Sequence, residues 1–157
     1  VGTITNMENV ASGSVDAIFF SHNIEHIYPH EVTPTLKEFL RVLSDDGFEV
    51  LTFPDLQSVC SAVANNKLLD TLYQSPAGPI TPLDVLYGHR ASIARGNYFM
   101  AHKCGFTYKV LSEAFLGVGF MSIMGGARPA AFDLWITAFK KMKTADEMKP
   151  FVEVHLP

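Results

Sequence analysis

Residues 14–55, SVDAIFFSHNIEHIYPHEVTPTLKEFLRVLSDDGFEVLTFPD, decide the fold, because they predict a strand, a helix and a second strand in one short stretch. Val15–Phe20 is an apolar run too short for a helix and is typical of a strand buried on both faces of a parallel sheet. The polar residues Ser21, His22 and Asn23 follow it directly. Ligands bind beyond the carboxyl ends of the strands in an open α/β sheet, so we expect a site here.

The helix between the two strands is expected to have Thr33 as its cap and Pro34 at its first position, where the missing N–H costs nothing. Its apolar side recurs at spacings of three and four residues, at Leu36, Phe39, Leu40 and Leu43. Gly47 is expected to end the helix before a second strand at Phe48–Phe53. Two strands joined by a helix are expected to be parallel, with a right-handed crossover.

Five short motifs occur in this stretch in a fixed order. They are Ser14-Val15-Asp16, His22, Glu25-His26, Glu38-Phe39-Leu40-Arg41-Val42-Leu43 and Pro54-Asp55. Their order resembles class I S-adenosylmethionine-dependent methyltransferases, in particular the small-molecule type 11 kind, around their fourth and fifth strands. The resemblance implies a Rossmann-like, three-layer α/β fold and S-adenosylmethionine as the cofactor. It also implies methyl transfer to an unidentified acceptor, expected to be a small molecule.

The chain departs from this family ahead of Ser14. No G-x-G motif occurs there, and thirteen residues are too few for three strands and their helices. We therefore expect residues 1–143 to form an incomplete domain, corresponding to the carboxyl-terminal two thirds of the family's fold, with residues 144–157 as a tail. Where relatives have Lys-Pro-Gly-Gly before the fifth strand, this chain has Ser44-Asp45-Asp46-Gly47.

Residues 56–103 are expected to form a helical and loop insertion over the site. Within it, Ser75–Pro79 is expected to be irregular, and Thr81-Pro82-Leu83-Asp84 predicts the capped start of a short helix. Polar aromatic residues are frequent in this region. We expect the acceptor to contact Tyr87, His89, Tyr98 and His102, although aromatic residues at such spacings also serve in packing.

The last part of the domain predicts a helix and an antiparallel hairpin. Thr107 is expected to cap the helix, which stops at Gly117 and Gly119. Two strands then follow at residues 120–124 and 132–139, and their short connection forces them to be antiparallel. The mixed sheet is therefore expected to end in an antiparallel hairpin.

Composition excludes several classes of protein. A formal net charge of −4 with 18% charged residues provides no basic surface for nucleic acid. Cys60 and Cys104 are far apart, so neither a disulfide framework nor a zinc knuckle is expected, and a reducing cytoplasm fits best. The apolar stretch Val110–Ala127 is broken by Glu113 and by glycines, so no membrane span is expected.

Methyl transfer from a sulfonium requires the protein mainly to place the acceptor, although a hydroxyl or amine acceptor also needs a base. By resemblance, Ser21 and His22 are expected to contact the cofactor, and His26, together with His22, to act as the base. Alternatively, His22 and His26 cap or pack the turn with Glu25 as their partner. Glu25 could also orient His26.

Residues before the first strand provide a second expected cofactor contact. Thr5-Asn6-Met7-Glu8 lies where relatives often carry an acidic residue whose side chain, with the next backbone N–H, meets adenine. Asn6 takes the place of the acid and Met7 follows it, and an amide can both donate and accept. The alternative is a simple loop.

There are two alternative functions, and the first of them uses the same residues. His22-Asn23-Ile24-Glu25-His26 matches the H-x-x-E-H pattern of inverted zinc peptidases. Pro29 limits the helix here to about one turn and no third ligand is evident, so no metal is expected. The third function is a non-catalytic, methyltransferase-like binding or oligomerisation module, in which the exposed edge of the first strand pairs two copies into a homodimer.

Overall fold

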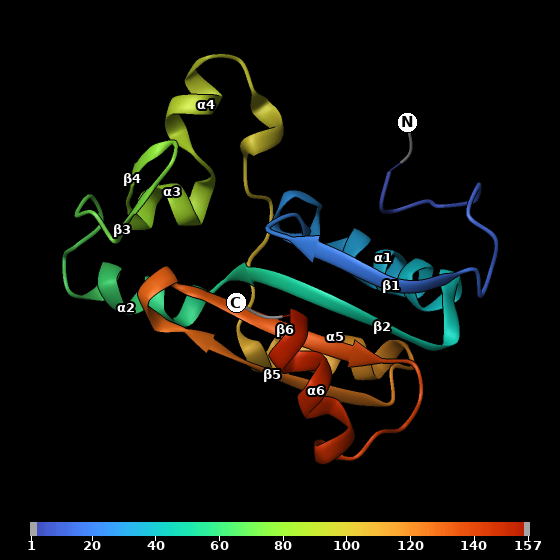
Figure 1. Ribbon diagram of the computed structural model, residues 1–157. Coiled ribbons are helices and arrows are strands. Elements are labelled where there is room, and N and C mark those ends of the chain that lie inside the picture. Colours follow the sequence, from blue (N-terminus) through green and yellow to red (C-terminus); the bar gives the residue numbers. More distant parts are fainter. Residues whose placement is uncertain (1–2, 156–157) are drawn as a thin grey trace.

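The computed structural model describes residues 3–155 and contains a four-stranded mixed sheet with the strand order β1-β2-β6-β5 (Figure 1). β1 (Val15–Ser21) runs parallel to β2 (Leu43–Pro54). β6 (Asp133–Phe139) is antiparallel to both β2 and β5 (Ser122–Arg128). The predicted α/β fold, with a mixed sheet that ends in an antiparallel hairpin, is confirmed.

The first helix, α1 (Pro29–Val42), begins earlier than predicted. Pro29 rather than Pro34 occupies the first position, and the Glu31 carboxylate accepts a hydrogen bond from the Tyr28 N–H at 2.7 Å. This earlier capping arrangement satisfies the helix start and leaves Pro34 inside the helix. The prediction of a start at Thr33 was therefore wrong.

The second strand also begins earlier than predicted. β2 starts at Leu43, which pairs with Val15, and the register then shifts so that Phe48 pairs with Ala17. Gly47 consequently lies within the strand instead of ending the helix. A register shift of this kind accommodates extra residues in one strand without ending the pairing.

Helices cover both faces of the sheet (Figure 1). On one face, α1 and α5 (Tyr108–Val118) pack against the sheet in the main core. The fully buried side chains of this core include Leu36, Phe39, Leu51, Phe53, Leu111, Phe115 and Ile136. As predicted, Thr107 caps α5 by accepting a hydrogen bond from the Val110 N–H. The helix ends at Gly119, whose φ of +117° favours glycine.

On the other face, α6 (Ala145–His155) covers one end of the sheet. Its Phe151 ring meets Phe48 and Phe139 edge to face, with centroid distances of 5.0 and 5.3 Å. Met148 is also buried. Much of the predicted tail is thus a helix in contact with the sheet; its last residues, 156–157, lie outside the described residues.

Between β2 and α5 the chain forms short elements that extend beyond the carboxyl ends of β1 and β2 (Figure 1). In chain order they are α2 (Leu56–Ala64), β3 (Tyr73–Ser75), β4 (Gly78–Ile80), α3 (Pro82–Tyr87), α4 (Arg90–Ala94) and a 3-10 turn at Tyr98–Met100. We refer to residues 73–102 as the roof.

Two predictions concern the roof directly. The predicted helix at Thr81 is confirmed, since the Thr81 hydroxyl accepts from the Asp84 N–H while the Asp84 carboxylate accepts from the Thr81 N–H at 3.0 Å. The prediction that Ser75–Pro79 is irregular was wrong. This segment turns β3 into β4, because Ser75 pairs with Gly78, whose φ of +115° suits glycine. No helix among residues 3–155 is long and apolar enough to cross a membrane.

Candidate functional site

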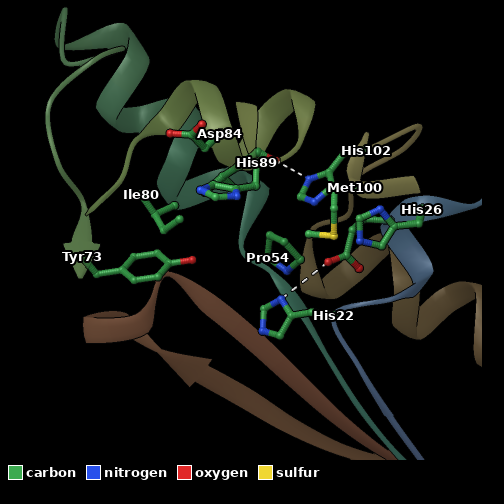
Figure 2. A pocket seen from close by; sticks show the side chains of 11 residues that line it. His22, His26, Pro54, Tyr73, Ile80, Asp84, His89, Met100 and His102 are labelled. Carbon is green, nitrogen blue, oxygen red and sulfur yellow. Dashed lines mark hydrogen bonds and ion pairs between the residues drawn. The ribbon is translucent and has the colours of Figure 1, made fainter. Parts of the chain in front are cut away.

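A cavity of about 160 Å³ lies beyond the carboxyl ends of β1 and β2, beneath the roof (Figure 2). Its lining comes from the loop after β1, from the end of β2 and from the roof. The lining residues are His22, Glu25, His26, Pro54, Tyr73, Ile80, Asp84, Val85, His89, Met100 and His102. The topology therefore places polar side chains at the sheet edge where ligands of α/β folds bind.

The end of β1 fixes the position of His22. The His22 N–H continues the parallel ladder by donating to the Thr52 carbonyl at 2.9 Å, and the Ser21 and Thr52 hydroxyls lie 2.7 Å apart. The backbone of His22 then enters the left-handed region, with a φ of +48°. That conformation is uncommon for a residue other than glycine and is frequently found at functional sites.

His22 lies between two acidic side chains. Its Nε2 is 3.3 Å from Asp133 Oδ2, and its Nδ1 is 3.5 Å from Glu25 Oε1. Burial alone lowers the pKa of His22, but hydrogen bonding to Asp133 and Glu25 outweighs it and raises that pKa to about 9. The ring is therefore an imidazolium at neutral pH, a hydrogen-bond donor with no lone pair to accept a proton.

Asp133 is in turn held by Arg128, whose Nε donates to Asp133 Oδ1 at 2.8 Å. Burial of Asp133 raises the pKa of its carboxyl group, but hydrogen bonds from His22 and Arg128 more than compensate and lower it. Asp133 is only 3% exposed, so it is a buried carboxylate between two cations.

His26 and His102 meet edge to face, with ring centroids 4.8 Å apart. The Nδ1 of His26 lies 3.1 Å from the Ala101 carbonyl oxygen, and the Nδ1 of His102 lies 2.7 Å from the Val85 carbonyl oxygen. A carbonyl oxygen only accepts hydrogen bonds, so each Nδ1 carries a proton, and the lone pair of such a ring in its neutral form is on Nε2. Burial lowers the pKa of His102, which favours the neutral ring.

Backbone contacts bring these two histidines together. The Glu25 carbonyl accepts from the Lys103 N–H at 2.8 Å, and the His102 N–H donates to the Tyr87 carbonyl at 3.3 Å. Gly88 allows the roof to close on itself, because a Cβ atom there would lie 1.9 Å from the Met100 carbonyl oxygen. The φ of Gly88, +96°, also favours glycine.

The structure gathers four of the predicted site residues at this one cavity: His22, His26, His89 and His102 (Figure 2). Ser21 immediately precedes them at the end of β1. Tyr87 is 64% exposed and lines a second cavity next to this one. Tyr98 is 73% exposed and lines neither of the two cavities.

Asn6 and Met7 lie elsewhere, in the segment that precedes β1. The Met7 N–H, which the resemblance assigns to adenine, donates to Glu38 Oε2 at 2.9 Å, and Arg41 donates to the Met7 carbonyl at 2.8 Å. Asn6 is exposed, and its side chain accepts from the Glu8 N–H. Neither Asn6 nor Met7 lines the cavity, and their contact with a cofactor stays a prediction.

The arrangement of inverted zinc peptidases is not formed. Only a single 3-10 turn, Ile24–His26, follows β1 before α1 begins at Pro29. His22 lies outside that turn and pairs with Asp133. The two histidines of the H-x-x-E-H pattern therefore do not share the face of a helix that such a zinc site requires.

Sequence reasoning missed several residues of the site, chiefly Asp133, Tyr73 and Met100. The sequence did contain a signal for Asp133. Asp133 begins β6, which is antiparallel to β2, so it lies at the carboxyl end of β2, where it pairs with Pro54. Tyr73 and Met100 had none, because their place depends on how the roof folds over the sheet.

Comparisons with known proteins match this fold. The sequence model of a family described as a methyltransferase domain matches residues 1–51. No curated protein matches the sequence. Many solved structures resemble the chain at low sequence identity, among them the following three.

An S-adenosylmethionine-dependent methyltransferase from Thermotoga maritima is 15% identical, with a TM-score of 0.54, and the match covers 89% of this chain and 62% of that one. A second, from Methanosarcina mazei, is 15% identical with a TM-score of 0.56, covering 90% and 66%. The 1,6-didemethyltoxoflavin-N1-methyltransferase of Burkholderia thailandensis, solved with 1,6-didemethyltoxoflavin and S-adenosylhomocysteine bound, is 16% identical with a TM-score of 0.52, covering 88% and 48%.

The chain thus spans less than two thirds of the length of each of these solved chains. The family match covers the loop before β1, β1 itself, α1 and most of β2, which is the part of the sequence that carries all of the predicted motifs except Pro54-Asp55. The resemblance predicted from the sequence is therefore confirmed: residues 1–51 match the methyltransferase family, and the chain has the fold of the class I S-adenosylmethionine-dependent methyltransferases.

Proposed function

We propose that the chain supports methyl transfer from S-adenosylmethionine to a small acceptor bound in the cavity beneath the roof. The observation that carries the proposal is the position of that cavity, at the carboxyl ends of β1 and β2 of a methyltransferase fold, with imidazole rings facing it. S-adenosylmethionine supplies a methyl group that its sulfonium already activates. The protein then has to position the acceptor and take up its proton.

His26 is the proposed proton acceptor. Its Nδ1–H is held by the Ala101 carbonyl, so its Nε2 lone pair is available for a proton from an acceptor hydroxyl or amine. His22, which we also predicted as a base, is assigned a different part because its ring is already protonated near neutral pH. It serves as a cationic donor instead.

The cofactor's amino-acid end fits the residues after β1. The His22 side chain is charged and 41% exposed, so its positive charge favours a carboxylate nearby although its two N–H groups face Asp133 and Glu25, and Ser21 lies beside it. The adenine contact proposed for Asn6 and Met7 fits less well, since the Met7 N–H would first have to leave Glu38. His89 and His102 line the cavity on the proposed acceptor side, and Tyr87 and Tyr98 extend that side toward solvent.

Calorimetric titration of the metal-free chain with S-adenosylhomocysteine tests the proposal. We expect binding in the micromolar range, weakened by about tenfold in His22→Gln because the positive charge near the cofactor's carboxylate is lost. His30→Gln, an exposed histidine of α1 away from the cavity lining, is the matched control and should bind like the parent chain. Absence of binding at millimolar ligand would overturn the proposal.

The second candidate is a non-catalytic module that pairs with another copy through β1. Within residues 3–155, β1 has β2 as its strand partner on one side only, and Phe19 in β1 is 69% exposed. An unpaired strand edge is a template for pairing with another chain. A concentration-dependent dimer in sedimentation experiments, without S-adenosylhomocysteine binding, would favour this candidate; a monomer at high concentration would count against it.

A further inference from the structure

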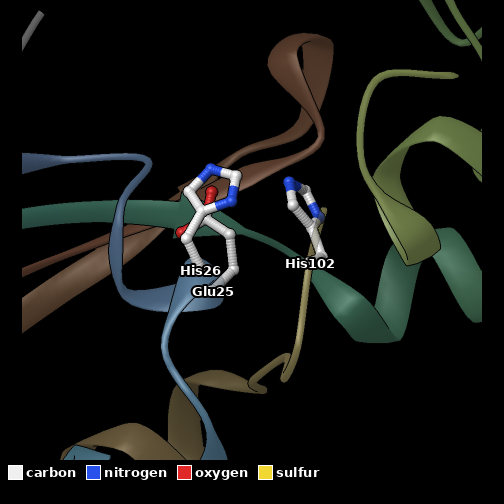
Figure 3. A group of neighbouring side chains, drawn as sticks. All are labelled: Glu25, His26 and His102. Carbon is white, nitrogen blue, oxygen red and sulfur yellow. The ribbon is translucent and has the colours of Figure 1, made fainter. Parts of the chain in front are cut away.

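Glu25, His26 and His102 form a compact cluster at one wall of the cavity (Figure 3). Each offers one potential metal-ligand atom, and these atoms all lie within 4.8 Å of one another. Two of the residues are neighbours in the turn after β1, and the third comes from the end of the roof. The cluster therefore exists only because the roof is folded against the sheet.

The carboxylate of this cluster is incompletely satisfied. Glu25 is 2% exposed, and its Oε2 has no hydrogen-bond partner among residues 3–155. Its other oxygen, Oε1, faces His22 at 3.5 Å. A buried carboxylate oxygen without a partner is costly, and buried charges are normally paired or coordinate metals. Glu25 also lines the cavity, so its free oxygen points to a bound cation there.

The two imidazoles are already oriented as metal ligands usually are. A histidine that binds a metal commonly donates its other ring N–H to a backbone carbonyl, which fixes the tautomer and the direction of the lone pair. His26 donates in this way to the Ala101 carbonyl, and His102 donates to the Val85 carbonyl. Within residues 3–155 the Nε2 atom of neither ring takes part in a hydrogen bond or ion pair, so both Nε2 positions remain available.

We propose that Glu25, His26 and His102 bind a divalent transition-metal ion of the zinc or iron(II) type. Two imidazoles and one carboxylate are a ligand set that such ions prefer, and three protein ligands leave an open position toward the cavity. Zinc bonds of 2.0–2.2 Å in a tetrahedral site require ligand atoms about 3.4 Å apart. Since the ligand atoms lie within 4.8 Å of one another, they have to close by at most about 1.4 Å to reach this spacing.

Metal binding and the proton-acceptor role of His26 exclude each other, because both use the same lone pair. A bound ion would instead favour release of the acceptor hydroxyl's proton to water by lowering the pKa of that hydroxyl. That consequence rests on the proposed function, whereas the metal site itself does not.

Titration of the chelator-treated chain with Co²⁺, followed by visible absorption, and then with Zn²⁺ by calorimetry tests the site. We expect one equivalent of either ion at micromolar affinity or tighter, and a loss of at least about tenfold in His102→Gln and in Glu25→Gln. His89→Gln lines the same cavity without belonging to the cluster, so its metal affinity should be unchanged.

Thermal unfolding provides a second readout that does not require an activity. Zn²⁺ should raise the Tm of the parent chain and of His89→Gln, because it binds only the folded state, and should leave that of His102→Gln unchanged. Equal metal affinity in the parent, His26→Gln and His102→Gln, or no binding at millimolar metal, would overturn the proposal. S-adenosylhomocysteine is titrated into metal-free protein, and the metal ions are titrated in the absence of cofactor. The proposed function and the proposed metal site can therefore fail independently of each other.

Discussion

His26, from the turn after β1, and His102, from the end of the roof, bring their rings together edge to face with centroids 4.8 Å apart. Each donates its Nδ1–H to a backbone carbonyl, so the pair is fixed by the main chain of the roof. The roof is consequently part of the site and does more than cover it. Substitutions of the two histidines therefore test separate roles.

His26→Gln should leave the affinity for S-adenosylhomocysteine within about twofold of the parent chain, because we place His26 on the acceptor side. The same substitution should abolish the zinc-dependent rise in Tm, since the Gln side chain provides no imidazole lone pair. Calorimetry and thermal unfolding of one variant check both effects. A loss of S-adenosylhomocysteine binding as large as in His22→Gln would place His26 on the cofactor instead.

Gly88→Ala should open the close contact within the roof between Gly88 and Met100. The new Cβ would lie 1.9 Å from the Met100 carbonyl oxygen, and the residue would also have to hold a φ of +96°. We expect a loss in the free energy of unfolding of about 2 kcal/mol or more. Denaturant titration checks this value.

The matched control is Gly96→Ala, which has a similar φ of +89° but no atom within 4 Å of its new Cβ. It should cost only the backbone strain of about 1–2 kcal/mol. Equal losses of stability in the two variants would show that close packing at Gly88 does not stabilise the roof.

Asp133→Asn should destabilise the chain by about 1–3 kcal/mol, since it leaves Arg128 and His22 facing a neutral amide in place of a buried carboxylate. Chemical unfolding at neutral pH measures the loss. Asp146→Asn, an exposed acid paired with Lys149 on the surface, is the control and should have almost no effect. If Asp133→Asn also had almost no effect, solvent would already screen the ion pairs of Asp133 with His22 and Arg128.

Glu49 predicts a pH dependence of stability. Its side chain is fully buried in β2, neither carboxylate oxygen has a hydrogen-bond partner within the described residues, and burial raises its pKa well above the usual 4.5. Between pH 4.5 and its raised pKa, Glu49 is therefore protonated in the folded state and ionised in the unfolded state. The contribution of Glu49 to stability is greatest below pH 4.5 and falls by about 1.4 kcal/mol for each pH unit above it, until the folded carboxyl also ionises.

Glu49→Gln should remove that slope, because an amide does not titrate. The variant should match the parent chain near pH 4.5 and exceed it in stability at pH 8, as measured by unfolding across that range. Glu153→Gln, an exposed acid in α6, should keep the parent's slope. A parallel pH profile for parent and Glu49→Gln would show that Glu49 is ionised in the folded chain.

Sequence reasoning predicted the features that depend on local patterns. The strand at Val15, the cap at Thr107 and the antiparallel hairpin of β5 and β6 follow from short-range hydrophobicity and turn chemistry. Errors arose where two local signals were present. Pro29 and Pro34 are both suited to the first position of a helix, and the helix begins at Pro29 because Glu31 caps it.

The site was predictable only in part, for a different reason. His22 and His26 follow a strand directly, so the sheet edge places them. The partners that decide their chemistry come from distant elements: Asp133 from the start of β6 and His102 from the end of the roof. No spacing in the sequence reveals that Asp133 makes His22 a cation or that His102 completes a cluster with Glu25.

The most direct test of the central claim, that the cavity beneath the roof is where the methyl group is presented, is a nuclear Overhauser measurement with ¹³C-methyl-labelled S-adenosylmethionine bound to the chain. The account predicts contacts from the labelled methyl group to the ring protons of His22 and His26. A bound methyl group with contacts only to residues outside the cavity, such as Asn6 or Phe19, would contradict it.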